Sequence, residues 1–177
     1  MKYANINHNK RDRGTSIRAV LLILALVTSF ALPTLRPPVS QAQASGTVVG
    51  WGNNDFGQLD IPASLSGVMA ISAGTLHSLA LKADGTVVGW GDNSEGQATP
   101  PAGLTGVTAI SAGGGFDLLD GHSLALKSDG TVVGWGDNSE GQATPPAGLS
   151  GVVAISAGIE HSLALKSDGT VVGWGSN

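Results

Sequence analysis

From residue 46 onward, short apolar runs alternate with clusters of turn-forming residues. In one stretch the segments 131–135, 152–157 and 162–166 are rich in β-branched or other apolar residues, and each is bounded by Gly, Pro, Asn or Asp. No part of this region repeats apolar residues with the 3.6-residue period of a helix. The pattern predicts short β-strands joined by turns and almost no helix.

Asp-Gly pairs lie between two of the strand types. They occur at 84–85, 129–130 and 168–169, each between a Ser-Leu-Ala-Leu-Lys run and a Thr-Val-Val-Gly-Trp run. Because glycine accepts a positive φ without a Cβ clash, Asp-Gly suits a tight hairpin, and we expect the two runs to pair antiparallel. The segment 143–148 contains two prolines, which have no N–H to donate, so it is expected to be a surface connection.

The whole pattern recurs along the chain. The heptad Gly-Thr-Val-Val-Gly-Trp-Gly begins at residues 46, 85, 130 and 169, at spacings of 39, 45 and 39 residues. A period near 40 residues indicates a repeat architecture. Each unit supplies one tryptophan, two leucines and several small residues, which is enough to join neighbouring sheets but too little to stabilise one unit alone. The repeats therefore predict an all-β fold of β-propeller blades, with a β-solenoid as the alternative.

The first 44 residues follow a different pattern. A basic leader precedes an apolar run of 14 residues at 19–32, and prolines and the small-x-small site Ala42-Gln43-Ala44 follow it. This order is typical of a secretory signal peptide. Fourteen residues at about 1.5 Å each fall short of a hydrocarbon core of roughly 30 Å. We expect cleavage after Ala44, no membrane insertion after cleavage, and a secreted, periplasmic or cell-envelope location.

Two segments are therefore predicted, a signal peptide at 1–44 and a repeat region at 45–177. About three repeats start near residues 46, 85 and 130, and a final strand covers 169–175. The repeat region has three lysines against twelve acidic residues, a formal net charge of −9. Such a surface repels phosphate backbones and anionic lipid headgroups, so nucleic-acid binding is not expected.

Two segments carry a family resemblance. Residues 51–59 (Trp-Gly-Asn-Asn-Asp-Phe-Gly-Gln-Leu) and 71–81 (Ile-Ser-Ala-Gly-Thr-Leu-His-Ser-Leu-Ala-Leu) resemble the two signature segments of the regulator of chromosome condensation repeat, and 155–165 matches the second again. The resemblance covers 46–175 and implies a propeller, usually of seven blades with four strands each. The short period and the Trp-Gly-Asp-Asn turn are most similar to the secreted bacterial branch, which includes the propeller-type beta-lactamase inhibitory protein.

About three blades fit in the repeat region, so the ring is expected to be incomplete. Two explanations stay open: the chain oligomerises to close a ring, or it is a piece of a longer array. The first and last strands share one heptad, and each leaves an apolar sheet edge that invites pairing with another chain.

Candidate chemistry is sparse. His77, His122 and His161 occupy one equivalent position, and each is expected to hydrogen-bond the backbone of its own blade rather than to bind a metal. The turns 92–96 and 137–141 lack the alternating acids of a calcium loop and are interpreted as side-chain-capped turns. There is no nucleophile elbow, phosphate loop or dinucleotide fingerprint. The sequence thus predicts no catalytic, metal-binding or cofactor-binding residues, and no enzyme.

The repeats differ in two places. Residues 85–113 and 130–158 are identical at 27 of 29 positions, whereas 114–121 adds six residues to a two-residue link, and the first repeat has Phe56 where the others have Glu. An exposed loop with aromatic and aliphatic residues between acids is a plausible contact tip. We hypothesise a protein contact, the alternative being a neutral insertion; the residues are Phe116, Asp117, Leu118, Leu119, Asp120 and Phe56.

Together these patterns indicate an exported, non-enzymatic propeller module that binds a protein or a cell-envelope component, or itself. One alternative, implied by the resemblance, is a beta-lactamase-inhibitor-like protein. A second is a structural fragment of a larger repeat array. A third, guanine-nucleotide exchange, is disfavoured because export separates the chain from any nuclear GTPase.

Overall fold

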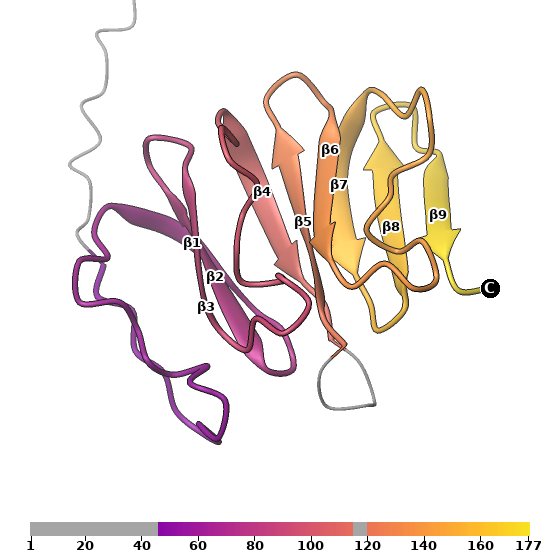
Figure 1. The fold of residues 1–177 in the computed structure, drawn as a ribbon. Coiled ribbons are helices and arrows are strands. Elements are labelled where there is room, and N and C mark those ends of the chain that lie inside the picture. Colours follow the sequence, from indigo (N-terminus) through magenta and orange to yellow (C-terminus); the bar gives the residue numbers. More distant parts are fainter. Residues whose placement is uncertain (1–45, 115–119) are drawn as a thin grey trace, which may run out of the picture. The chain divides into compact units, whose positions relative to one another are not determined.

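The computed structural model describes residues 46–114 and 120–177, so the predicted signal peptide and four of the hypothesised contact residues, Phe116 to Leu119, lie outside the described part. The described residues form three antiparallel sheets of three strands each, which follow one another in chain order (Figure 1). The strands are β1 (Val68–Ala73), β2 (His77–Lys82), β3 (Val87–Gly91), β4 (Val107–Ala112), β5 (His122–Lys127), β6 (Val132–Gly136), β7 (Val152–Ala157), β8 (His161–Lys166) and β9 (Val171–Gly175).

The predicted hairpins are present in all three sheets. In the second sheet Leu126 pairs with Val132, and the Lys127 N–H donates to the Thr131 carbonyl at 2.9 Å. Gly130 closes the turn at a φ of 80°, which only glycine adopts at little cost. Each hairpin therefore forms where an Asp-Gly pair stands, and the all-β prediction is confirmed.

Each sheet has three strands, whereas the resemblance implied four. The segment that would add the fourth runs beside β3, where a Cβ on Gly89 would lie 2.3 Å from the Ala98 carbonyl oxygen. The Ala98 N–H, however, donates to the Asn93 side-chain oxygen at 2.9 Å. Because the turn's own asparagine occupies this donor, the segment follows the sheet edge without forming a ladder. Asn138 and Ala143 repeat the arrangement in the second unit.

The sheets stack face to face as blades. Between the first and second sheets, Leu79 and Leu81 pack with Val107, Ala112 and Trp135 in a buried apolar cluster. Leu126, Val152 and Ala164 form the matching cluster between the second and third sheets. Each cluster is therefore built from recurring residues of two consecutive repeats, so the packing depends on neighbouring repeats being present.

Small residues allow β1, β4 and β7 to approach closely. A Cβ on Gly74 would lie 2.6 Å from the Gly113 carbonyl oxygen, and one on Gly113 would lie 2.4 Å from that of Gly158. Side chains also link neighbouring sheets, since the Ser72 hydroxyl oxygen accepts the Ala112 N–H at 3.0 Å. Glycine at this position is therefore a requirement of blade stacking.

Candidate protein-binding surfaces

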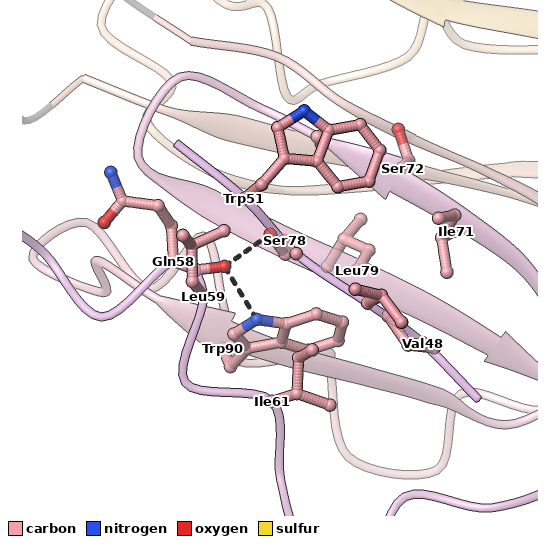
Figure 2. A pocket seen from close by; sticks show the side chains of 13 residues that line it. Val48, Trp51, Gln58, Leu59, Ile61, Ile71, Ser72, Ser78, Leu79 and Trp90 are labelled. Atoms are coloured by element: carbon pink, nitrogen blue, oxygen red, sulfur yellow. Dashed lines mark hydrogen bonds between the residues drawn. The ribbon is translucent and has the colours of Figure 1, made fainter. Parts of the chain in front are cut away.

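One carbonyl oxygen joins each turn to the next sheet. The Gln97 carbonyl accepts the Trp135 Nε1–H at 2.8 Å and the Ser123 hydroxyl at 2.9 Å. Trp135 and Ser123 are directly opposite each other on β6 and β5, so they reach the carbonyl from one face. Gln58 and Gln142 repeat the contact in the other two units (Figure 2 shows Gln58).

The histidines lie at the junctions between blades. His77 Nε2 is 2.9 Å from the Ser123 hydroxyl oxygen, and His122 Nε2 is 2.8 Å from that of Ser162. These two histidines thus pair with a side chain of the following sheet, and for them the prediction of a backbone partner in their own blade was wrong. Both are fully buried, and burial lowers the pKa of each to about 4. They are held neutral as structural groups.

The acidic turns are closed by their own side chains. The Gln97 amide donates to Asp92 Oδ2 at 2.6 Å, and the Ser94 hydroxyl donates to the same oxygen at 2.9 Å. Gln142 makes the same short contact with Asp137. These bonds fit the interpretation as capped turns. Among the described residues, no group of three or more His, Cys, Asp or Glu is placed to hold a metal ion.

Charge separates the two ends of the sheets. At the end with the Asp-Gly turns, which we call the hairpin end, Lys127 lies 3.4 Å from Asp129, and Lys82 and Lys166 form the equivalent pairs. Hydrogen bonds from Thr131, with Lys127 nearby, lower the pKa of Asp129 to about 2. The described lysines all lie at this end.

At the opposite end, which we call the link end, the Asp, Glu, Lys and Arg residues that the structure describes are all acidic. It comprises the connections 75–76, 120–121 and 159–160, and the acidic turns lie beside them because the Asp92 N–H donates to the Leu76 carbonyl and the Asp137 N–H to that of Gly121. The described charged residues here are Asp55, Asp60, Asp92, Glu95, Asp120, Asp137, Glu140 and Glu160.

Two of the hypothesised contact residues can be placed. Asp120 is half-buried at the link end, beside Gly121. Phe56 is also half-buried, and its N–H donates to the Gln58 side-chain oxygen at 2.9 Å in the first acidic turn. That turn packs against Gly91, where a Cβ would lie 2.5 Å from the Leu76 carbonyl and 3.1 Å from the Gln58 Cα. Both residues therefore belong to the link end.

Sequence reasoning missed an apolar hollow on the first sheet. It has a volume of about 220 Å³ and lies between the segment 46–51 and the sheet (Figure 2). Trp51 is 85 % exposed and Ile71 is 61 % exposed, while Trp90 and Ile61 line the wall behind them. The sequence signal for the hollow was the position of Ile71 in the first repeat. Its equivalents Ile110 and Ile155 pack against a preceding sheet, whereas the first sheet has none among the described residues.

Comparisons with known proteins identify the repeat. The family model described as "Regulator of chromosome condensation (RCC1) repeat" matches residues 69–97, 120–142 and 152–177. A search of curated proteins gave no match. No helix among the described residues is long and apolar enough to cross a bilayer.

Several solved structures share the fold. Yeast RCC1 (Prp20), crystallised with Kap60, matches with a TM-score of 0.57 and 22 % identity over 71 % of this chain and 38 % of that one. Human WBSCR16 matches with a TM-score of 0.53 and 21 % identity, over 70 % of this chain and 41 % of that one. The ectodomain of the Physcomitrella patens receptor kinase CR4 matches with a TM-score of 0.51 and 26 % identity, over 61 % of this chain and 29 % of that one. This chain thus spans less than half the length of each.

The matched segments fall one in each of the three sheets, and their stacking is that of the RCC1 propeller. The chain therefore carries the regulator of chromosome condensation repeat in these three segments.

Proposed function

We propose that the chain is an exported, non-enzymatic binding module whose link end contacts a protein with a basic surface. The observation that carries the proposal is the separation of charge: the link end bears acids and no described lysine, whereas each lysine is paired at the hairpin end. A field of one sign attracts an oppositely charged partner and speeds its association.

The variation between repeats supports the same end. The six additional residues fall within 114–121, in the link of the second blade, while the rest of that unit is almost identical to the third. A stack of repeats holds such a loop on rigid strands, which is how binding loops are commonly presented. Export would give this surface access to extracellular partners, and the CR4 ectodomain carries a similar fold in a receptor.

A binding role also suits the histidines. His77 and His122 are the groups most often used for proton transfer near neutral pH, yet both are enclosed between blades and bonded to serines. Substrate would have to separate the sheets to reach them. Their burial supports a structural role and leaves the link end as the accessible surface.

The proposal is tested by shortening the loop. Partners are captured from the host's culture fluid and envelope extract on the immobilised protein, identified, and titrated calorimetrically against the purified protein. Deletion of residues 115–120 leaves Gly114 and Gly121 as a two-residue link. It should weaken binding at least tenfold because it removes the proposed contact residues of the loop. Lys127→Gln at the hairpin end is the control and should bind normally. Unchanged affinity in the deletion variant would overturn the proposal.

The beta-lactamase-inhibitor alternative is tested with the same two proteins. Titration of a beta-lactamase should give loop-dependent inhibition if the enzyme is the partner. Inhibition that survives the deletion would assign the contact to another surface, and would count against the link end.

A further inference from the structure

The two outer faces of the blade stack are apolar, and no further sheet of the described residues packs on them. On the third sheet, Leu163 and Leu165 are each 38 % exposed and Val171 is 60 % exposed. We call this the leading face, because the equivalent residues of each earlier sheet point toward the next one. On the first sheet, Ile71 is 61 % exposed and borders the apolar hollow with Trp90. We call this the trailing face.

Inside the chain, these same faces cover each other. Leu79 and Leu81, the counterparts of Leu163 and Leu165, are 0 % and 2 % exposed because the second sheet packs on them. Ala112, the counterpart of the exposed Ala73, is buried in that contact. The surfaces needed for one more junction are therefore present at the two sides of the stack, where no further sheet of the described residues packs on them.

The polar groups of a junction are present as well. His122 reaches Ser162 across one junction and His77 reaches Ser123 across the other. His161 holds the equivalent position on the leading face, where it is exposed and its imidazole makes no hydrogen bond among the described residues. Ser78 holds the serine position on the trailing face, with its hydroxyl already oriented by the Gln58 carbonyl at 3.0 Å.

We propose that a second copy of this chain docks head to tail, the leading face of one copy against the trailing face of the other. Leu163 and Leu165 enter the hollow lined by Ile71 and Trp90, and His161 meets Ser78. The contact continues an interface that the chain already makes twice, with the same residue types in the same positions. It is independent of the link-end proposal, since it uses the faces of the sheets.

The segment 46–52 has to move for this contact to form. It lies over the hollow (Figure 2). It has the same heptad as β9, so in the docked pair it would compete with β9 of the other copy for pairing with that copy's β8. β9 is paired with β8 along its length, whereas 46–52 makes no hydrogen bond among the described residues. The unpaired segment is the one that gives way.

The test uses two variants that each block one face. Leu163→Asp places a charge on the leading face, and Ile71→Asp does so on the trailing face. Sedimentation of the purified protein over micromolar concentrations should show reversible association, and each variant alone should associate at least tenfold more weakly. Mixed in equal amounts, the two variants should recover a 1:1 pair, because one intact face of each kind remains. Contact between two like faces would give no such recovery.

Val153→Asp is the matched control. Val153 is 54 % exposed on the third sheet, but its counterpart Thr108 is exposed on a sheet that is covered on both faces, so this position lies outside the junction. The control should associate like the unmodified protein. Circular dichroism checks that each variant is folded, and Leu163→Asn or Ile71→Asn replaces an aspartate variant that is not.

The outcomes separate cleanly. A monomeric unmodified protein, association unchanged in both variants, or folded variants whose mixture stays monomeric would each overturn the proposal. The variant that lacks residues 115–120 should associate like the unmodified protein, so failure of the link-end proposal is recognised separately. Because each repeat region carries a net charge of −9, added salt should strengthen the contact. Weaker association in salt would point to ion pairing instead of apolar docking.

Discussion

At the scale of single residues, the blade junctions depend on neutral imidazoles. His77 and His122 each bridge to a serine of the next sheet, and neither is exposed to water. A buried imidazolium would lose its hydration, which is why burial lowers both pKa values from 6.5 to about 4. The neighbouring Asp92 and Asp137 oppose this effect without cancelling it.

The lowered pKa values predict a specific dependence of stability on pH. Between pH 6.5 and about 4 the unfolded chain binds protons at these histidines and the folded chain does not, so the free energy of unfolding should fall as pH falls through this window. The full effect is on the order of 3 kcal/mol per histidine. Urea unfolding at several pH values measures it.

His122→Gln is the informative variant, because glutamine keeps a donor for Ser162 and cannot titrate. The loss of stability on acidification should be smaller in this variant than in the unmodified protein. An equal loss in both would show that other groups control it. The lowered pKa values of Asp84 and Asp129, about 2, act only at lower pH.

At the scale of elements, turn chemistry fixes each strand pair. Gly130 has a φ of 80°, and a Cβ there would lie 3.3 Å from the Gly151 nitrogen. Asp129 then holds the turn by accepting the Thr131 N–H and hydroxyl at 3.0 and 2.6 Å. The hairpin therefore has one position that needs glycine and one that needs a short acceptor.

Gly130→Ala should lower the free energy of unfolding by about 1–2 kcal/mol, since alanine resists the left-handed backbone conformation. Gly46→Ala is the control, because its added Cβ meets no atom within 4 Å. Chemical denaturation of both variants measures the difference. Equal midpoints would contradict the assigned role of Gly130.

Most elements could be predicted from the sequence, and the failures share a cause. The strand Val152–Ala157 was predicted to the residue, and β6 was one residue out, because apolar runs and Asp-Gly pairs are local signals. The expected fourth strand does not form, because the Asn93 side chain accepts the Ala98 N–H. The partner of His77 could not be predicted, because Ser123 is 46 residues away in the sequence. The hollow could not be predicted either, since exposure of Ile71 depends on which sheet covers it.

At the scale of the molecule, the sheets are held at a distance that only glycine permits. Gly113 lies so close to the third sheet that a Cβ would be 2.4 Å from the Gly158 carbonyl oxygen. Backbone atoms cannot turn aside as a side chain can. The close spacing of the second and third sheets therefore requires a residue without a side chain at Gly113.

Gly113→Ala should lower the free energy of unfolding by about 2–3 kcal/mol, because the second and third sheets must separate to admit the methyl group. Gly158→Ala is the paired control: its Cβ would meet the imidazole of His161, which is exposed and free to rotate. A cost for Gly158→Ala as large as that for Gly113→Ala would contradict this account. Thermal unfolding of the two variants gives the comparison.

The near identity of residues 85–113 and 130–158 has a consequence for how such a chain can change. In each unit one face of the sheet packs against the opposite face of the next unit, and the same residue types make the contact at both junctions. Duplication or loss of one unit in the gene would leave every remaining junction with its tryptophan, leucines, histidine and serine. The number of blades is thus a variable that recombination can alter in one step, while the rules of assembly stay constant.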